Sequence, residues 1–583
     1  MRSTAVKDQD AAPAAAVTAR PGRYAMLEQL RADGVRFMFG NPGTVEQGFL
    51  DSIAEFPDIQ YVLTLQETIA VGVGDGYARA ARKPAVVQLH SGVGLGNGVG
   101  MLYQAKRGHA PLVVFAGESG VMYDAMDAQM ASDLVAIARP VTKWSTRVLH
   151  PSSLLRVIRR AIKIASTPPM GPVFVALPMD VLDGPNTEVA VPTSIPVTRV
   201  TPSDEDVAAA ARLLGQAERP LIIFGDGVAF SGGQRALVEV AEALGADVWG
   251  ADSSEVSIPA SHPLYRGQLG HMFGSHSTPI VKAADAVLVA GTYLLPEVFP
   301  NLEDIFAPGA AVIHVDLDSY EIAKNFPVTL GLVADPELTL GGIAVALQKV
   351  MKPEQVKAAA ARRAAARARR DEEDEQAIAA DRKAWDQTPM RPARFMSELA
   401  SRLGGKALIF DEALTSSPDL TRYIPPDEPG NYFQTRGGSL GVGIPGALGA
   451  KLAHPEKTVI GFTGDGGSMY TIQALWTAAH HGIGAKFVIC NNGSYKLLKL
   501  NIQQYWRERG LAEHDFPASF DLMRPDIRFD QLARAMGVQA VRVERPEEIG
   551  PALDAALADD SPFLIDLVLT DEVAGHGHIR CGQ

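Results

Sequence analysis

The tripeptide Gly-Asp-Gly occurs three times in this chain, at 74–76, 225–227 and 464–466, and each copy could form a phosphate loop, a metal site or an ordinary tight turn. The third copy follows the apolar run "TVIGFT", and the next apolar run, "AKFVIC", leads into an Asn-Asn pair. Asn492 lies 27 residues after Asp465, a length that fits one strand-helix-strand unit. The spacing therefore predicts a carboxylate and an amide at the carboxyl ends of neighbouring parallel strands.

These two side chains suit a magnesium ion that also carries phosphate. Mg²⁺ prefers a few oxygen ligands from the protein, and phosphate oxygens and water complete its octahedron. Backbone N–H groups at the predicted helix start can bind the same phosphates. The predicted clamp comprises Asp465, Asn492 and Ser494 for the metal and Gly464, Gly466, Gly467 and Ser468 for the phosphates.

The other two copies lack such partners. The first lies in "VGVGDGYARA", a helical pattern in which glycines allow close helix packing. The second follows the apolar run "LIIF", where an open sheet often builds a ligand loop. Its surroundings contain neither a complete dinucleotide fingerprint nor a Walker lysine, so a plain strand-to-helix turn fits at least as well.

Short apolar runs such as "VRFMFG", "PAVVQLH" and "APLVVFAG" alternate with helical patterns along most of the chain. Such alternation indicates an α/β fold, and we predict three doubly wound parallel-sheet domains. A Pro/Thr-rich segment at 184–206 and a stretch of helix formers at 350–390, basic first and then acidic, separate them. The expected bounds are 1–20 for a flexible tail, 21–190 for the first domain, 200–350 for a central domain, 351–390 for a solvated helical linker and 391–583 for the third domain.

Composition narrows the classes of function. The formal charge of −13 argues against general nucleic-acid binding, which needs an excess of basic residues. No apolar run approaches the length of a membrane span, and the first twenty residues do not resemble a signal peptide. Two cysteines cannot make a disulfide framework. We therefore expect a cytoplasmic protein with a small-molecule substrate.

Further motifs accompany the third copy: "NPGTVEQGFL", "LQETIAVGVGDGYARA", "KPAVVQLHSGVGLGNGVG" and "RGGSLGVGIPGALGAKLA". With Gly-Asp-Gly followed by Asn-Asn, they resemble the thiamine-diphosphate (ThDP) enzymes of the decarboxylase and acetolactate-synthase superfamily. Within that superfamily the chain is most similar to the benzoylformate decarboxylases. The resemblance runs from about residue 24 to 570. It implies that the first domain binds the pyrimidine of ThDP and the third binds its diphosphate with Mg²⁺.

The resemblance also assigns cofactor contacts. Glu67 matches the glutamate that hydrogen-bonds the aminopyrimidine, although a glutamate at a helix start is usually only a favourable N-terminal charge. Leu440 matches the bulky residue that holds the cofactor in its V shape, and Gly438 shares its loop. Thr415 and Ser416 are candidates for the diphosphate, although such residues are more often helix caps.

Substrate contacts follow in the same way. His90 matches a histidine beside the substrate, where an imidazole suits proton transfer, although a histidine at a strand end is more often structural. Thr44 and Glu46 match a serine and a glutamate near the pocket, and Leu498 is expected to line it. Lys496 and Lys499 could meet an anionic substrate or face water.

One departure bears on the reaction. Benzoylformate decarboxylases have a second active-site histidine in the central domain, but the matching segment here, "GTYLLPEVFPN", contains none. His271 and His276 lie earlier and are candidates to replace it. The absence leaves room for carboligation or for cleavage of a 2-hydroxyacyl compound.

We therefore expect a ThDP- and Mg²⁺-dependent lyase acting on a 2-oxo acid or acyl substrate. The alternatives are an acetolactate-synthase-like carboligase, a 2-hydroxyacyl-CoA lyase or oxalyl-CoA decarboxylase, and a non-catalytic subunit, against which the intact motif residues argue. The resemblance leaves room for FAD or another nucleotide in the central domain, which we do not expect here. It implies a homodimer or homotetramer with active sites between chains.

Overall fold

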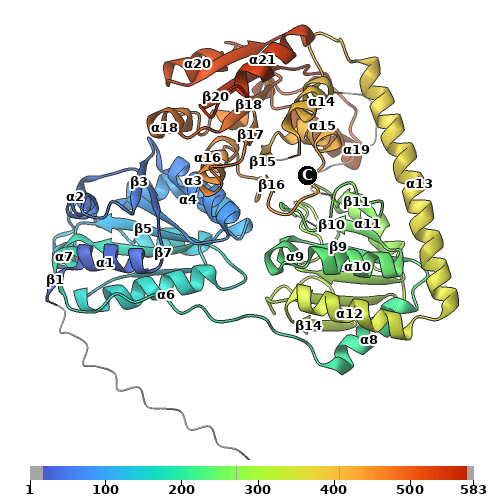
Figure 1. The fold of residues 1–583 in the computed structure, drawn as a ribbon, viewed down its shortest axis with the longest axis horizontal. Helices are drawn as coiled ribbons and strands as arrows, with labels where there is room; N and C mark the ends of the chain where they lie inside the picture. Colours follow the sequence, from blue (N-terminus) through green and yellow to red (C-terminus); the bar gives the residue numbers. More distant parts are fainter. Residues whose placement is uncertain (1–17, 252, 271, 406, 574–583) are drawn as a thin grey trace, which may run out of the picture.

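A computed structural model of the protein describes residues 18–251, 253–270, 272–405 and 407–573. Most of the tail predicted at 1–20 lies outside these residues. Figure 1 shows three α/β units at the corners of a triangle, with a long helix along one side. Each unit contains a sheet of six parallel strands, so the predicted α/β fold of three parallel-sheet domains is confirmed.

The first and third sheets share one strand order. The first runs β3 (Gln60–Leu63), β2 (Phe37–Gly40), β4 (Ala85–His90), β5 (Leu112–Glu118), β7 (Val173–Pro178) and β6 (Trp144–Arg147). The third runs β16 (Tyr432–Gln434), β15 (Leu408–Glu412), β17 (Val459–Gly464), β18 (Lys486–Asn491), β20 (Phe563–Val568) and β19 (Gln539–Val543). In both, the chain order of the strands across the sheet is second, first, third, fourth, sixth and fifth.

The central sheet is ordered differently. It runs β11 (Tyr265–Gln268), β10 (Asp247–Gly250), β9 (Pro220–Phe224), β12 (Ala286–Ala290), β13 (Ala311–Asp316) and β14 (Leu330–Val333). Its order of third, second, first, fourth, fifth and sixth is that of a dinucleotide-binding sheet. In the innermost strands of all three sheets almost every residue is buried, because helices cover both faces.

Helices complete each unit. The first has α1 (Gly22–Ala32), α2 (Gln47–Ile53), α3 (Glu67–Ala81), α4 (Ser91–Arg107), α5 (Leu134–Ala138), α6 (Leu154–Ser166) and α7 (Met179–Asp183). The central unit has α8 (Asp204–Gly215), α9 (Asp226–Ser231), α10 (Gln234–Leu244), α11 (Gly274–Lys282) and α12 (Pro336–Val350). The third has α14 (Pro392–Leu403), α15 (Ser417–Tyr423), α16 (Gly443–Ala453), α17 (Asp465–Ser468), α18 (Ala474–His481), α19 (Lys496–Arg509), α20 (Phe529–Ala535) and α21 (Ile549–Ala556).

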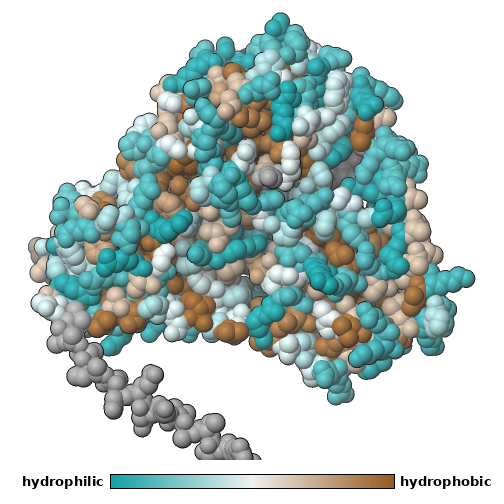
Figure 2. Space-filling model, viewed as in Figure 1, coloured by the Kyte–Doolittle hydropathy of each residue, from teal (hydrophilic) through white to brown (hydrophobic). Residues whose placement is uncertain are grey.

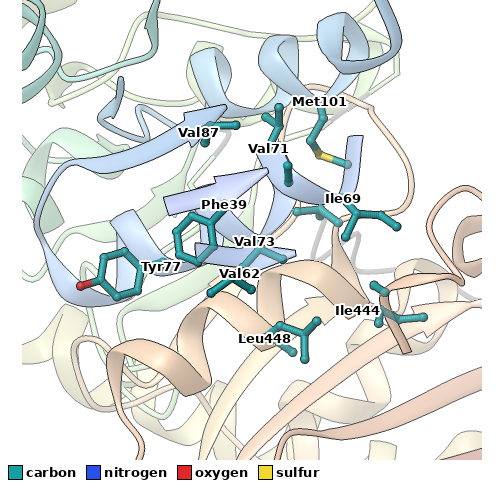
Figure 3. Packing of buried hydrophobic residues seen from close by; sticks show 14 of the residues in the cluster. Phe39, Val62, Ile69, Val71, Val73, Tyr77, Val87, Met101, Ile444 and Leu448 are labelled. Carbon is teal, nitrogen blue, oxygen red and sulfur yellow. The ribbon is translucent and has the colours of Figure 1, made fainter. Parts of the chain in front are cut away.

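Helices α3 and α16 pack directly on each other and join the first and third units. A Cβ atom on Gly76 would lie 2.0 Å from the carbonyl oxygen of Gly446, and one on Gly449 would lie 2.0 Å from that of Val73. Figure 3 shows Val73 and Leu448 within the apolar cluster that continues across this contact. The first Gly-Asp-Gly copy is therefore a helix-packing motif, as its pattern predicted.

The second copy forms a strand-to-helix turn, the plainer of its two interpretations. Asp226 accepts hydrogen bonds from the Ser254 N–H at 2.7 Å, the Ser254 hydroxyl at 2.6 Å and the Glu255 N–H at 3.1 Å. Burial alone would raise the pKa of Asp226, but Arg436 and these donors hold it below its ordinary value. A Cβ on Gly227 would lie 2.6 Å from Gly291 Cα, so this glycine admits the loop after β12.

The long helix is α13 (Pro353–Lys383), which connects the central and third units. Its 31 residues span about 46 Å. Only Ala359 and Ala366 are buried, and ion pairs such as Arg266–Glu373 at 3.1 Å hold the helix to the central unit. The helix lies within the stretch predicted as a helical linker at 351–390.

Figure 2 shows one face of the molecule, which is predominantly hydrophilic with hydrophobic residues in scattered patches. Among the described residues, no helix has both the length and the apolar character needed to cross a membrane.

Candidate functional site

The third Gly-Asp-Gly copy lies where β17 ends and α17 begins. The buried carboxylate of Asp465 accepts hydrogen bonds from the backbone N–H groups of Gly466 at 2.7 Å, Asn492 at 3.0 Å and Gly493 at 2.6 Å. Since β17 and β18 are neighbours in the sheet, the carboxylate and the Asn-Asn pair meet at one edge. The structure thus brings together the residues that the spacing placed side by side.

The electrostatics of this edge favour a bound cation. Burial raises the pKa of Asp465 to about 6, and the backbone donors around it only partly oppose that effect. A cation would offset the cost of keeping this carboxylate ionised. Among the described residues there is no cluster of three or more His, Cys, Asp and Glu side chains that could hold a metal ion. Amide and backbone oxygens would therefore have to supply part of any ligand set here.

The Asn492 side chain lies beside a serine. Its Oδ1 atom is 3.1 Å from the backbone N–H of Ser494 and 3.1 Å from the Ser494 hydroxyl oxygen. Ser494 is buried, and its hydroxyl also donates to the carboxylate of Asp571. Nothing in the sequence pattern singled out Asp571, because it comes after the last strand and meets Ser494 only through the fold.

A second loop approaches the same edge from β15. Glu412, which ends that strand, is buried and accepts the N–H groups of Gly441 at 2.5 Å and Gly443 at 2.7 Å. Burial raises the pKa of Glu412 to about 7 despite these donors. The loop that Glu412 holds carries the partly buried Leu440 and the exposed Gly438, which has a φ of +70°.

The short helix η5 (Leu414–Ser416) directly follows β15. Thr415 is partly exposed in it and Ser416 is buried. The strands β15 and β17 flank the point where the strand order of this sheet reverses, which is where ligands bind in open α/β sheets. Gly464, Gly466, Gly467 and Ser468 therefore share one edge with both residues.

In the first sheet, Glu67 is the first residue of α3 and is buried. One carboxylate oxygen accepts from the Asn41 amide at 3.3 Å, and the other accepts from the Asn97 amide at 3.0 Å. A Cβ on Gly94 would lie 2.7 Å from the Glu67 carboxylate. Sequence reasoning missed both asparagines, although each is a lone amide in a glycine-containing motif, "GNPG" or "GLGNG".

A second acidic residue, Glu46, lies under His90 at the end of β4. The His90 Nδ1 atom is 2.9 Å from one Glu46 oxygen, and the Gly117 N–H donates to the other at 3.0 Å. Burial raises the pKa of Glu46, and the contact with His90 opposes that effect. Gly43 is required here because its Cβ would lie 1.9 Å from the imidazole. Thr44, at the start of η1 (Thr44–Glu46), is exposed at the same edge.

Within one chain, Glu67 and the loop that carries Leu440 contact different parts of helix α4. Glu67 contacts the first half of α4 at Asn97, whereas Gly437, just before Leu440, lies against Tyr103 and Arg107 in the last turns. Ten residues of helix separate Asn97 from Arg107, or about 15 Å. Glu67 thus contacts the first half of α4, and the loop that carries Leu440 contacts its last turns.

The remaining predicted residues are a leucine, two lysines and two histidines, and they lie in different surroundings. Leu498 in α19 is 41% exposed. The Lys496 amine donates to the carbonyl of Thr570 at 3.0 Å and Lys499 pairs with Asp571, so both lysines bind the segment after β20. His276 is exposed in α11, and His271 lies outside the described residues.

Comparison with known proteins identifies the architecture. The N-terminal TPP-binding domain of thiamine pyrophosphate enzymes matches residues 20–137, the central domain matches 207–343, and the C-terminal TPP-binding domain matches 415–567. The chain is 32% identical over 551 residues to a benzoylformate decarboxylase from Pseudomonas aeruginosa, covering 93% of this chain and 98% of that protein. It is 27% identical over 561 residues to a probable acetolactate synthase large subunit from Methanocaldococcus jannaschii, covering 94% and 92%.

A solved structure agrees. The ThDP-dependent 4-hydroxybenzoylformate decarboxylase of Rhodococcus jostii superposes with a TM-score of 0.80 at 27% identity, covering 95% of this chain and 100% of that one. All three domains and nearly the full length of these relatives are therefore represented here. The chain belongs to the thiamine-diphosphate-dependent enzymes, and its first and third domains are the ThDP-binding domains of that family.

Proposed function

We propose that the protein is a ThDP- and Mg²⁺-dependent lyase that cleaves the bond next to the carbonyl of a 2-oxo acid, with release of CO₂. The observation that carries this proposal is the Glu46–His90 pair at the same sheet edge as Glu67. It provides a proton-transfer group beside the family's cofactor-activating carboxylate. The relatives named as benzoylformate and 4-hydroxybenzoylformate decarboxylases support an aromatic 2-oxo acid.

The residues of the third domain fit a magnesium diphosphate. Asp465 and Asn492 would hold the metal with Ser494, whose hydroxyl is engaged by Asp571 and which therefore offers its backbone carbonyl. The N–H groups at the start of α17, together with Thr415 and Ser416, would bind phosphate oxygens. When bound, ThDP supplies a nucleophilic carbon and an electron sink for the cleaved bond.

Glu67 would hydrogen-bond the aminopyrimidine ring. Its two oxygens already accept from the neutral amides of Asn41 and Asn97, which fix the carboxylate without neutralising it. Leu440 would support the bent cofactor from below, and Glu412 positions its loop through the N–H groups of Gly441 and Gly443.

His90 would exchange protons with the substrate. A hydrogen bond from its Nδ1–H to Glu46 leaves Nε2 as the atom that can take or give a proton. Glu46 in turn is fixed by the Gly117 N–H, so the imidazole has a defined orientation. Thr44 lies exposed beside the pair, and Leu498 is exposed in the third domain; we propose both as substrate contacts.

We further propose that two chains share each site. Helix α4 exposes Val93, Gly96, Asn97, Gly100 and Tyr103, and nothing lies within 4 Å of a Cβ built on either glycine. Two such faces packed antiparallel about a two-fold axis would bring the Glu67 end of one α4 to the Leu440 end of the other. A homodimer is then the smallest complete unit, and a tetramer can form from two of them.

A carboligase or an acyl-CoA-cleaving enzyme is the second candidate. The observation that favours it is the segment 291–301, which holds a buried Glu297 and no histidine. Burial raises the pKa of Glu297. The acetolactate synthase relatives at 27% identity are consistent with this reading.

The deciding experiment measures CO₂ release by purified protein with ThDP and Mg²⁺ over a panel of 2-oxo acids and oxalyl-CoA. Release from an aromatic 2-oxo acid, lost in Glu67→Gln, is the expected result and would identify the side-chain class. No release from any substrate by protein that binds ThDP would contradict the decarboxylase proposal. The assay would then turn to ligation and to hydroxyacyl cleavage.

A further inference from the structure

The segment that follows β20 is held by hydrogen bonds to the end of β18 and to the loop and helix α19 that come after it. The Leu569 N–H donates to the Asn491 carbonyl at 2.7 Å, continuing the sheet by one step past the last paired residues. The next residue, Thr570, accepts from the Lys496 amine at 3.0 Å. Asp571 then reaches back to the loop of the proposed metal site, where one oxygen accepts from the Ser494 hydroxyl and the other pairs with Lys499.

The Ser494 hydroxyl lies between two possible acceptors, Asp571 and Asn492. A serine hydroxyl has one proton to donate. The Ser494 oxygen lies within hydrogen-bond distance of both Asp571 and Asn492 Oδ1, but its proton can serve only one of them. A carboxylate oxygen is a stronger acceptor than an amide oxygen, and Asp571 is held in place by its second contact, with Lys499. The Asn492 oxygen is therefore left with the Ser494 N–H as its donor and keeps a lone pair.

We propose that Asp571 is a positioning residue for the metal site, acting by drawing the Ser494 proton away from Asn492. Without Asp571, the Ser494 hydroxyl can rotate and donate to Asn492 Oδ1, which is already 3.1 Å away. That hydrogen bond competes with a cation for the same oxygen. The inference rests on the proposed magnesium site and goes beyond it, since no pattern in the sequence assigns Asp571 a role.

Lys499 forms an ion pair with Asp571 beside the proposed metal site. The Asp571 side chain is 42% exposed, whereas that of Lys499 is 12% exposed. The ion pair thus lies partly exposed beside the Ser494 loop, with its lysine more buried than its aspartate. Outer partners that orient a metal ligand commonly contribute about 10- to 100-fold to metal affinity.

The test measures Mg²⁺ affinity of the full-length apoprotein at saturating ThDP, by quenching of tryptophan fluorescence. Asp571→Ala should weaken Mg²⁺ binding about 10-fold. The double variant Ser494→Ala/Asp571→Ala should recover affinity to within about twofold of wild type, because the competing hydroxyl is gone. A merely structural role for Asp571 predicts the reverse, with the double variant as weak as the single variant or weaker. The variant Asp571→Ser, whose shorter side chain cannot make both contacts, should behave like Asp571→Ala and replaces it if that chain does not fold.

Two controls separate position from charge. Asp571→Asn keeps an oxygen within reach of Ser494 but offers only a neutral acceptor like Asn492, so Mg²⁺ affinity should fall less than in Asp571→Ala, and the protein should melt at a lower temperature because Lys499 loses its partner. Glu572→Gln removes the same charge from the next residue, which is exposed, and should change neither quantity. If Asp571→Ala binds Mg²⁺ as tightly as wild type, and ThDP binding by wild type depends on Mg²⁺, the role of Asp571 is overturned while the proposed metal site stands. Wild-type ThDP binding that needs no divalent metal overturns the proposed metal site and the inference with it.

Discussion

The first and third sheets have the same strand order but carry different chemistry at the same edge. In each, the loops after the first and third strands flank the point where the order reverses. In the first sheet these loops present Glu46 and His90, a carboxyl and an imidazole suited to moving protons. In the third they present Glu412 and Asp465, and both carboxylates accept backbone N–H groups of glycine.

The equivalent helices α3 and α16 differ in the same way. Each follows the second strand of its sheet, but α3 begins with the carboxylate of Glu67, whereas α16 begins with Gly443, whose N–H donates to Glu412. One topology thus carries an edge suited to moving protons and an edge that we propose binds anions and a metal, according to which residues stand at the strand ends. The comparison can be tested by disabling each edge separately.

Glu67→Gln should disable the first edge alone. The side chain keeps its shape but loses the charge that would favour the reactive form of the cofactor. We expect kcat to fall about 1,000-fold, within the range for general acid–base groups. The ThDP dissociation constant, measured by fluorescence titration, should change by less than about fivefold. A large loss of cofactor affinity with little change in kcat would assign Glu67 to binding instead.

Asp465→Ala should disable the third edge alone. It removes the buried carboxylate at the proposed metal site, and we expect Mg²⁺-ThDP affinity to fall about 100-fold or more. At saturating cofactor, kcat should recover most of its wild-type value. Calorimetric titration with Mg²⁺ at fixed ThDP measures the first effect and steady-state kinetics the second. If Asp465→Ala retains its affinity for Mg²⁺, the residues that bind the metal must lie elsewhere.

Mixing the two variants, each impaired at limiting Mg²⁺, tests whether the edges that cooperate belong to different chains. Chains carrying Glu67→Gln and chains carrying Asp465→Ala, refolded or coexpressed together, should form mixed dimers with one intact site each. For random pairing about a two-fold axis, about a quarter of the sites would be intact. Activity of the mixture at limiting Mg²⁺ should therefore exceed that of either variant alone. No gain in a mixture shown to contain mixed dimers would place each site within one chain.

The pH dependence of Mg²⁺ affinity should report on the third edge, where Asp465 lies. Because the pKa of Asp465 in the apoprotein is about 6, protons compete with Mg²⁺ for its carboxylate at lower pH. Mg²⁺ affinity should be level above about pH 7 and fall about tenfold per pH unit below about pH 6. The smaller slope expected for Asp465→Ala, measured in the same titration, is the control. A profile that rises as the pH falls would exclude the carboxylate as ligand.

The sequence predicted what depends on spacing along the chain. Asp465 and Asn492 could be placed together because a strand-helix-strand unit of fixed length connects them. The glycine-rich helix at 71–80 could likewise be assigned to packing, since its pattern has helical periodicity.

Contacts between distant elements could not be predicted in the same way. Asn41 reaches Glu67 from the loop after β2 and Asn97 from helix α4, and Asp571 reaches Ser494 from the far end of the chain. From the sequence, Lys496 and Lys499 could contact an anionic substrate or face water. In the structure both contact the segment after β20 instead. Such contacts depend on how distant elements pack together, which periodicity and motif spacing along the sequence do not reveal.

The contact between α3 and α16 also has a mechanical consequence. Where a Cβ atom would meet a carbonyl oxygen at 2.0 Å, the two backbones touch without side chains between them. Such an interface cannot slide by exchanging rotamers, as helices that pack through long side chains can. Close backbone packing at this contact therefore opposes sliding of the first domain against the third within one chain. Any opening at the proposed site would then come from peripheral loops or, if two chains share the site as proposed, from displacement of one chain against the other.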